Sequence, residues 1–343
     1  MNKKILLLAI VVVFVLIAGA CAGNEAPEQP APGDNNQQQG KDEPKQENVN
    51  VAETIVAQWK ESAHATAVGE ETPEDAPGMR ENCAKCHNGY AFELNAENLE
   101  GIGILKGQSC DTCHTKWGAE IMDKGTVETA IGTIEDGTGA VCSACHNGRG
   151  KEPNGESAPH HSNQTDMLLS KNGAEVEGFN YGTSPHAGVT DTCLGCHMSE
   201  DENDIKDHTF KMNKENIANS CNRCHPNFQS FNPEAKGDYD GDGNKEGMQD
   251  EVAGLVELLT NKINEQLNGG KVVSSHGKVV FQDAQENEIE APDEKLYGAA
   301  WNAFYVDYDG SQGIHNPNYS VQLLQQSYKD VTGEDVPNAD LRE

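Results

Sequence analysis

The sequence has few of the residues from which a protein core is built. Only 36% of its 343 residues are hydrophobic, 6% are aromatic, and the mean hydropathy is −0.68. The length allows one large domain or two small ones. Because this supply of apolar side chains is thin, we expect a non-protein apolar group to fill part of the interior.

Basic residues are also scarce. The chain has 25 Lys and Arg against 56 Asp and Glu, which gives a formal charge of −31. Binding to nucleic acid needs a basic surface that can neutralise phosphates. The composition therefore excludes nucleic acid as a partner, whereas basic proteins and cationic metal species remain compatible with it.

Long hydrophobic runs are confined to the start of the chain. Lys3 and Lys4 precede an apolar run over residues 5–18, which ends in Ala-Gly-Ala before Cys21. A short basic region, a short apolar region and small residues before a cleavage point are typical of an export signal. The run is too short for a typical membrane-spanning helix. Residues 1–20 are therefore predicted to be an export signal.

Cys21 stands where a bacterial lipoprotein carries its lipid. The preceding residues resemble a lipobox, although Ala18 occupies a position where Leu or Val is usual. The alternative is an ordinary cleavage site followed by an unmodified cysteine. We predict lipidation of Cys21, because more than one acyl chain anchors a protein stably. The mature protein is then a lipoprotein on the outer face of the cytoplasmic membrane, in the periplasm or at the cell surface.

Residues 21–50 are rich in Glu, Gln, Asn, Pro and Gly and have few aromatic or branched apolar residues. Such a composition cannot form a packed core. We predict a disordered, lipid-anchored tether that holds the folded part away from the membrane.

Ten of the eleven cysteines belong to five copies of Cys-x-x-Cys-His. This pattern attaches c-type haem: two thiols bond to the haem vinyl groups, and the adjacent histidine reaches the iron. A zinc site does not require a histidine after each Cys pair, and a redox dithiol leaves all five histidines unexplained. The motifs are Cys83-x-x-Cys86-His87, Cys110-x-x-Cys113-His114, Cys142-x-x-Cys145-His146, Cys193-x-x-Cys196-His197 and Cys221-x-x-Cys224-His225.

We therefore predict five covalently bound haem c groups within residues 51–232, with the motif histidines as proximal iron ligands. Haem also accounts for the missing apolar core. Covalent haem is attached outside the cytoplasm, which agrees with the export signal. Because the thiols are used by haem, a disulfide framework is not expected, even in an oxidising compartment.

Twelve histidines occur in the chain, and seven remain outside the motifs. Electron-transfer haems commonly take a second axial ligand, which in multihaem proteins is usually histidine. Met167 and Met198 are further candidates, but methionine more often fills a core. The seven histidines are His64, His160, His161, His186, His208, His276 and His315.

The apolar periodicity predicts a mainly α protein with much irregular structure. A helix is expected over Val51–Ala67 and another near Gln164–Ser170, with loops around them. Residues 233–343 are expected to form a C-terminal helical region. Its helices are predicted over Met248–Leu267, Asp293–Tyr305 and Tyr319–Thr332, and a hairpin over Lys271–Phe281.

The C-terminal region begins with carboxylates at alternate positions, Asp238, Asp240 and Asp242. With the intervening glycines they resemble the first half of an EF-hand or dockerin-type calcium loop. Position twelve is Gln249 instead of Glu, so Asp250 or Glu251 would have to substitute. The alternative is a solvated acidic turn. We predict a calcium site here.

Together, these pieces resemble the multihaem cytochromes c related to cytochrome c nitrite reductase and its electron-transfer relatives. The similar segments are Trp59…Ser62-x-His64, Pro159-His160…Gln164-x-x-Met167, Ser184-x-His186, Cys196-His197-Met198, His208-Thr209-Phe210 and Gly313-Ile-His315-Asn316-Pro317. The resemblance implies a chain wrapped around a row of haems. It also implies distal ligands at His64, His160, His186, His208 and His315, and leaves His161 and His276 spare.

Nitrite reductases of this kind typically carry Lys in the motif of the catalytic haem, whereas all five motifs here end in His. With five distal candidates, the sequence favours an electron carrier between a membrane-side donor and an external acceptor. The alternatives are a reductase of nitrite, hydroxylamine or a similar small species, and a subunit of an extracellular cytochrome polymer.

Overall fold

The computed structural model describes residues 49–66, 76–103, 105–189, 191–214 and 216–343. The predicted export signal, Cys21 and nearly all of the tether lie outside these residues. The described chain belongs to one compact unit, residues 49–343. None of its described helices is long and apolar enough to cross a membrane.

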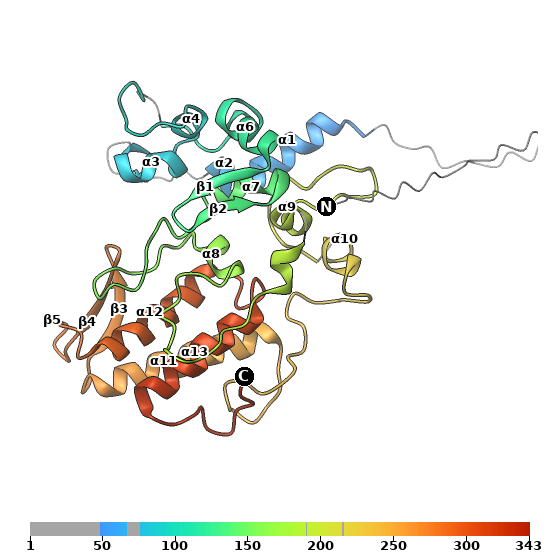
Figure 1. Ribbon diagram of the computed structural model, residues 1–343. Coiled ribbons are helices and arrows are strands. Elements are labelled where there is room, and N and C mark those ends of the chain that lie inside the picture. The colour runs from blue at the N-terminus through green and yellow to red at the C-terminus, as the bar shows by residue number, and fades with distance from the viewer. Residues whose placement is uncertain (1–48, 67–75, 104, 190, 215) are drawn as a thin grey trace, which may run out of the picture. The chain divides into compact units, whose positions relative to one another are not determined.

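The protein is mainly helical, as predicted, and long irregular stretches join the helices (Figure 1). The first part of the chain forms short elements only. They are α1 (Val51–Glu61), α2 (Ala63–Thr66), η1 (Pro77–Met79), α3 (Glu81–His87), α4 (Gly89–Glu93), α5 (Cys110–His114), α6 (Lys116–Lys124), η2 (Gly137–Gly139), α7 (Ala140–Ser143), α8 (Gln164–Leu168), η3 (Pro185–Gly188), α9 (Thr192–His197), α10 (Ile217–Ser220) and η4 (Cys221–Arg223).

The helix predicted over Val51–Ala67 is divided at Ser62, which has an extended backbone with ψ 154°. The Ser62 hydroxyl donates to the carbonyl of Trp59 at 2.7 Å and accepts from the amide of Ala65 at 3.3 Å. A serine side chain that bonds to the backbone competes with helix continuation and favours a new helix start. The break places His64 on the separate short helix α2.

Each Cys-x-x-Cys-His motif lies on or directly beside a short helical turn. The turns are α3, α5, the end of α7, α9 and η4. Residues three apart share one face of a helix. A helical turn therefore presents both cysteines of a motif on the same side, which suits attachment to one porphyrin edge.

A small hairpin that the sequence analysis did not predict connects α6 to the third motif. Strands β1 (Thr126–Thr129) and β2 (Gly132–Glu135) pair antiparallel, with Val127 opposite Ile134. Both side chains are buried in a cluster with Phe92 and Ile121. Apart from this cluster and a smaller one around Ile102, the described residues 49–157 contribute few buried apolar side chains.

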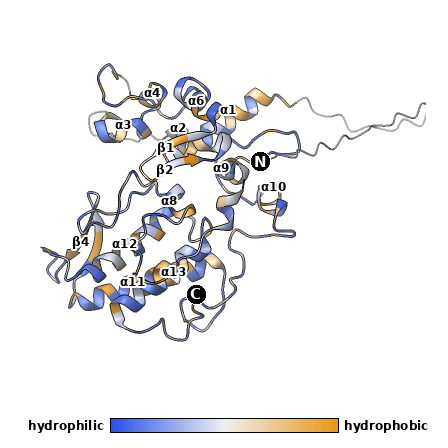
Figure 2. Cartoon of the chain, in the orientation of Figure 1, coloured by the Kyte–Doolittle hydropathy of each residue, from blue (hydrophilic) through white to orange (hydrophobic). Residues whose placement is uncertain are grey.

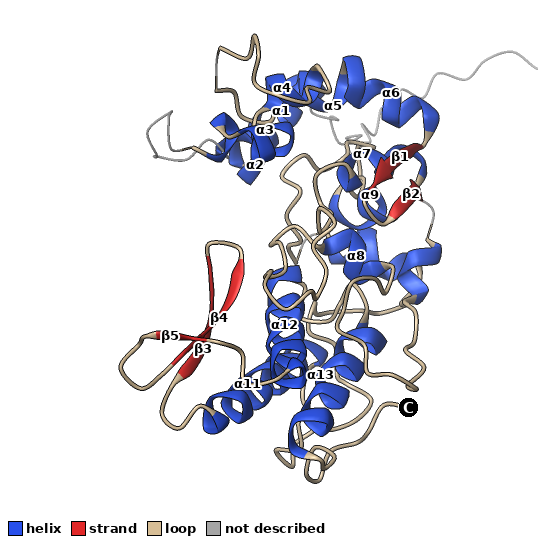
Figure 3. Ribbon diagram, turned by 60° about the vertical axis from the view of Figure 1, so that its left-hand side comes forward, coloured by secondary structure: helices blue, strands red, loops and turns tan. Residues whose placement is uncertain are grey.

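The C-terminal region contains the long helices. They are α11 (Met248–Gln266), α12 (Glu294–Asp309) and α13 (Pro317–Thr332). Strands β3 (Lys271–Ser275), β4 (Lys278–Gln282) and β5 (Glu288–Ile289) follow α11 in the chain and lie to one side of the helices in Figure 3. The three predicted helices and the predicted hairpin are confirmed. Strand β5, which extends the hairpin to a sheet of order β3-β4-β5, was not expected.

Local signals explain where these helices begin and end. Asp293 caps α12 by accepting from the amide of Leu296 at 2.7 Å. Asn316 caps α13 in the same way, and Pro317 takes the first helical position, where its missing N–H costs nothing. The glycines that follow α12 and α13 have φ of 73° and 79°, values that favour glycine.

The main hydrophobic core lies among α11, α12 and α13, whose ribbons carry both hydrophilic and hydrophobic residues (Figure 2). Trp301, Tyr319 and Leu323 are fully buried in it. Met167 of α8 belongs to the same core, and the Asn163 side chain donates to the carbonyl of Tyr305 at 2.8 Å. The C-terminal helices therefore support α8 and the segments around it.

Candidate haem sites

Each of the five motif histidines faces one histidine from outside the motifs. The facing rings come from distant parts of the chain, and their centres lie 6.0 to 6.5 Å apart. The pairs are His87–His161, His114–His208, His146–His64, His197–His315 and His225–His186.

This spacing suits one metal ion between the two rings of a pair. An imidazole nitrogen binds a metal at about 2 Å, and the ring centre lies roughly 1 Å behind that nitrogen. Two such ligands on opposite sides of one iron therefore hold their ring centres roughly 6 Å apart. The five observed separations agree with this value, so each pair has room for one iron with two imidazole ligands.

At the first motif, the structure places His161, and not the predicted His160, opposite His87. The ring centres of His87 and His161 are 6.0 Å apart, and His160 stacks behind His161 at 4.3 Å. The two nitrogens of His160 face other groups, with Nδ1 2.5 Å from the Ser162 hydroxyl and Nε2 3.4 Å from Arg149 Nη1. One ligand atom from each of His87, His160 and His161 lies within 4.8 Å of the others, so His160 stays a prediction from the resemblance, while the ring positions favour His161.

The other four predicted distal histidines, His64, His186, His208 and His315, each lie opposite a motif histidine. Two further candidates, His276 and Met167, lie elsewhere. His276 is exposed in the turn between β3 and β4, bonded to Ser275 at 2.8 Å. Met167 is buried in the C-terminal core, where its sulfur accepts from the hydroxyl of Ser320 at 3.4 Å.

Hydrogen bonds to Nδ1 orient several of these rings. The Nδ1 atoms of His186, His197 and His208 lie 2.9, 3.0 and 2.8 Å from the carbonyls of Ile314, Phe210 and Lys206. His315 Nδ1 lies 2.7 Å from Asp309 Oδ1. A partner at Nδ1 fixes the tautomer that leaves Nε2 free to bind a metal.

Burial lowers the pKa of several paired histidines and so favours the neutral form that metal ligands need. It lowers the pKa of His64 to about 4, with the nearby His146 adding to the effect. Burial is also the main cause of the lowered pKa of His87 and His197. His315 differs: burial opposes the change, but the Asp309 carboxylate outweighs it and raises the pKa.

The motif cysteines show which sites are neighbours. The thiol of Cys145 is the main cause of the lowered pKa of Cys86, and the thiol of Cys142 is the main cause of the raised pKa of Cys193, so these thiols lie close together. The Cys86 thiol is the main cause of the raised pKa of Cys145. Burial adds to the effect, and so do the charges of nearby thiols, including Cys113. The third motif therefore adjoins the first, the second and the fourth.

The fifth motif adjoins the fourth. Burial is the main cause of the raised pKa of Cys196, and the Cys224 thiol adds to it. In the same way, burial and then Cys196 raise the pKa of Cys221. The five sites are therefore connected. The first, second and fourth sites adjoin the third, and the fifth adjoins the fourth.

Comparison with known proteins gives a family model and a solved structure. Residues 49–115 match the family model described as cytochrome c554 and c-prime. The fold resembles the crystal structure of the outer cell wall cytochrome OcwA, with 20% sequence identity and a TM-score of 0.51. The likeness covers 81% of this chain and 50% of that one, so the chain spans about half the length of the structure it matches. No curated protein matches significantly.

The matched residues 49–115 contain the first two Cys-x-x-Cys-His motifs, and the fold match is also to a cytochrome. The motifs supply the attachment chemistry, and the fold match supplies the architecture. Both matches agree with the haem attachment that the motifs predict.

Unpartnered polar atoms in the protein are consistent with haem in these positions. Among the described residues, the buried side-chain atoms without a hydrogen bond include Gln108 Oε1, Ser109 Oγ, Asn163 Oδ1 and Ser199 Oγ. Each of these residues lies within two positions of a motif or of His161. Because buried polar groups are normally satisfied, the positions agree with a further group beside them.

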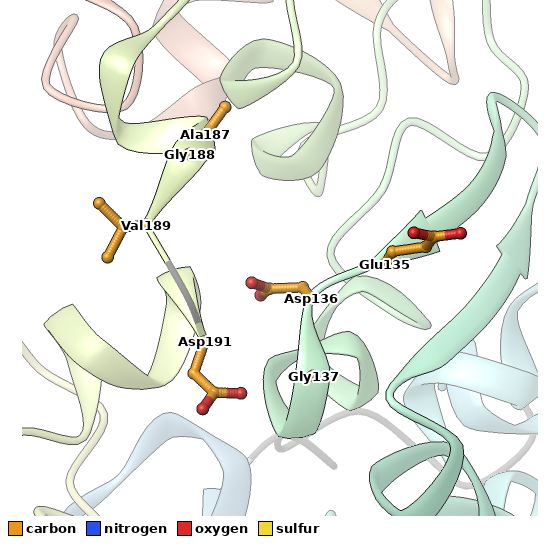
Figure 4. Close-up of a pocket in the computed structure, with 7 residues that line it drawn as sticks. All are labelled: Glu135, Asp136, Gly137, Ala187, Gly188, Val189 and Asp191. Carbon is orange, nitrogen blue, oxygen red and sulfur yellow. The ribbon is translucent and has the colours of Figure 1, made fainter. Parts of the chain in front are cut away.

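An acidic cavity of about 220 Å³ lies beside the third and fourth motifs, lined by Glu135, Asp136 and Asp191 (Figure 4). Asp136 Oδ1 accepts from the amide of Thr192, at the start of α9, at 2.8 Å. Asp191 Oδ1 accepts from the amide of Gly139, just before α7, at 3.4 Å. Asp136, before the third motif, thus caps the helical turn of the fourth motif, and Asp191, before the fourth motif, caps the turn of the third. These two hydrogen bonds hold the two motifs together.

The three loop aspartates of the predicted calcium site lie together. One carboxylate oxygen from each of Asp238, Asp240 and Asp242 falls within 4.8 Å of the others. Burial, together with Asp242 and other nearby carboxylates, raises the pKa of Asp240 to about 6. The two residues expected to substitute for Gln249 have other partners: Asp250 accepts from the side chain of Asn232, and both Glu251 oxygens accept from backbone amides.

Two groups beside the histidine pairs were given no role from the sequence. Phe210 packs its ring on His64 at 4.6 Å, while its carbonyl faces His197. Asp309 contacts His315 from the end of α12. Asp309 lies six residues before His315. This spacing points to Asp309 as a partner only after His315 is known to face a motif histidine.

Proposed function

We propose that the protein is an exported pentahaem electron carrier in which every iron has two histidine ligands. The observation that carries the proposal is the set of five histidine pairs at metal-bridging distance. Five irons would then be held by the motif histidines on one side and by His64, His161, His186, His208 and His315 on the other.

In this proposal the protein's own groups attach, orient and space the cofactors. The motif cysteines fix each porphyrin covalently, and the paired histidines fill both axial positions. The carbonyls of Ile314, Phe210 and Lys206 hold the imidazole rings in place. The bound haem supplies one-electron chemistry, and the protein sets its spacing and potential.

The neighbouring cysteines support a branched path for electrons. The third motif is the junction for the first, second and fourth, and the fifth follows the fourth. Cys110 and Cys224 are exposed, whereas the other eight motif cysteines are partly buried. The second and fifth sites are therefore the proposed points of exchange with a redox partner and an external acceptor.

The histidine pairs favour a carrier over an enzyme. A reductase of nitrite or hydroxylamine needs an iron with one open position and acid groups around it. Here each motif histidine already faces a second imidazole. A subunit of a cytochrome polymer would need exposed haem sites at two ends. Because Cys110 and Cys224 are exposed, a polymer subunit remains the third candidate function.

We propose a location outside the cytoplasm, as a lipoprotein anchored through Cys21. The export-like start of the chain and the extracytoplasmic chemistry of haem attachment support it. We also propose that Asp238, Asp240 and Asp242 bind calcium, because a hard cation would neutralise three carboxylates held within 4.8 Å.

The carrier proposal is tested by comparing electron exchange with turnover on the same purified protein. Reduced viologens should transfer electrons rapidly to all five haems, because outer-sphere transfer needs only an accessible haem edge. Nitrite and hydroxylamine should not be consumed above the rate of free haem. Steady consumption of either substrate would replace the carrier with the reductase.

A further inference from the structure

A buried carboxylate contacts one of the haem-facing histidines. Asp309, the last residue of α12, lies with Oδ1 2.7 Å from His315 Nδ1. Its side chain is 0% exposed, and its ion-pair partner in the described part of the chain is His315. The negative charge of Asp309 is therefore directed at the ring opposite His197.

A tight loop, residues 310–316, fixes this contact. Gly310 reverses the chain with a φ of 73°. The second oxygen of Asp309 then accepts from the amide and the hydroxyl of Ser311. The same hydroxyl accepts from the amide of His315 at 3.0 Å. These three hydrogen bonds hold the Asp309 carboxylate and the His315 imidazole in one geometry.

The Nδ1 partners described for four other paired histidines are neutral. His186 and His208 face backbone carbonyls, as does His197, and His146 faces the Gln164 side chain at 3.2 Å. Among the paired histidines whose Nδ1 contacts are described, His315 is the one that faces a carboxylate. A carboxylate acceptor makes an imidazole a stronger electron donor to its metal than a carbonyl does.

We propose that Asp309 is a positioning residue that lowers the reduction potential of the haem held by His197 and His315. Ferric iron carries one more positive charge than ferrous iron, so a nearby negative charge and a more basic ligand both favour the ferric form. Burial strengthens the effect, because the charge is poorly screened. This inference rests on the proposed function, since it requires His315 to be an iron ligand.

The consequence concerns the path between the third and fifth sites. Cys193 lies near Cys142 of the third motif, and Cys196 lies near Cys224 of the fifth, so the fourth site stands between these two motifs. An electron moving along this path passes through the site that Asp309 makes harder to reduce. Asp309 thereby sets the energetic step at the centre of the row, and with it the rate of transfer from the junction to the exposed fifth site.

The test is a spectroelectrochemical titration of the holoprotein with Asp309→Asn and the matched control Asp307→Asn. Asp307 lies on the same helix but is exposed. In Asp309→Asn, one of five components should become easier to reduce, with at least a ten-fold change in its ferric-to-ferrous ratio at fixed potential, or about 59 mV. The other four, and all five in Asp307→Asn, should be unchanged.

Ser311→Ala provides a second variant with the opposite sign. Removing the hydroxyl leaves more negative charge on the carboxylate, so the same component should become harder to reduce. An Asp309→Asn protein with five haems and unshifted potentials would overturn the inference, as would a Ser311→Ala shift in the same direction as Asp309→Asn. His315→Ala separates the two proposals: if it creates no high-spin haem, the ligand assignment itself fails.

Discussion

Replacing His161 by alanine should open one iron and only one. The structure places His161 6.0 Å from His87 and directs both nitrogens of His160 to Ser162 and Arg149. Loss of the His161 ring removes one of ten axial histidines, so about a fifth of the haem should become high-spin. The expected high-spin fraction follows from the five histidine pairs, because the variant opens one of five irons.

The assay is the absorption and electron paramagnetic resonance spectrum of the purified variant, normalised to total haem. His160→Ala is the matched control, since it removes an identical side chain from the next position and should leave every iron low-spin. A double variant tests whether His160 moves in when His161 is lost. High-spin signal in His160→Ala, with none in His161→Ala, would refute the pairing and restore the assignment implied by the family resemblance.

Three further results are expected. Glu93→Gln should destabilise the protein by about 1–3 kcal/mol, because the buried Glu93 carboxylate accepts from Lys106 at 2.6 Å and Lys116 at 2.9 Å. Chemical denaturation measures the loss of stability. An equal loss in the exposed control Glu97→Gln would contradict the prediction. The ion pairs outweigh burial and lower the pKa of Glu93, so its contribution is present above the unfolded pKa of about 4.3 and lost as pH falls below it. Asp240→Asn should abolish a calcium-dependent gain in stability that amounts to about 2.7 kcal/mol at a hundred-fold excess over Kd, whereas equal losses with calcium and with chelator would indicate an acidic turn. Cys21→Ser should move the protein from the membrane fraction to the soluble fraction, and unchanged fractionation would exclude the lipid anchor.

Local chemistry explains why much of the fold was predictable. Thioether attachment requires two cysteines three residues apart and a histidine next to them, so the motifs are visible without a structure. The C-terminal helices carry their own end signals, such as Asn316-Pro317 before α13 and Asn268-Gly269-Gly270 after α11. The β1–β2 hairpin has a weaker signal, since only Val127 and Ile134 mark its buried side.

The pairing of histidines depends on the tertiary path and could not be obtained from spacing. His64 faces the third motif and not the first, which follows it in the sequence. His315 reaches the fourth motif only because α12 and α13 hold the loop between them. The choice between His160 and His161 depends on loop side-chain directions, which no periodicity encodes.

The central claim is that every iron has two imidazole ligands. Its most direct test is exposure of the fully reduced, native holoprotein to carbon monoxide while the absorption spectrum is recorded. The account predicts no rapid carbon monoxide adduct and a low-spin spectrum before and after exposure. A rapid adduct on about one fifth of the haem, or a high-spin component in the native protein, would contradict it.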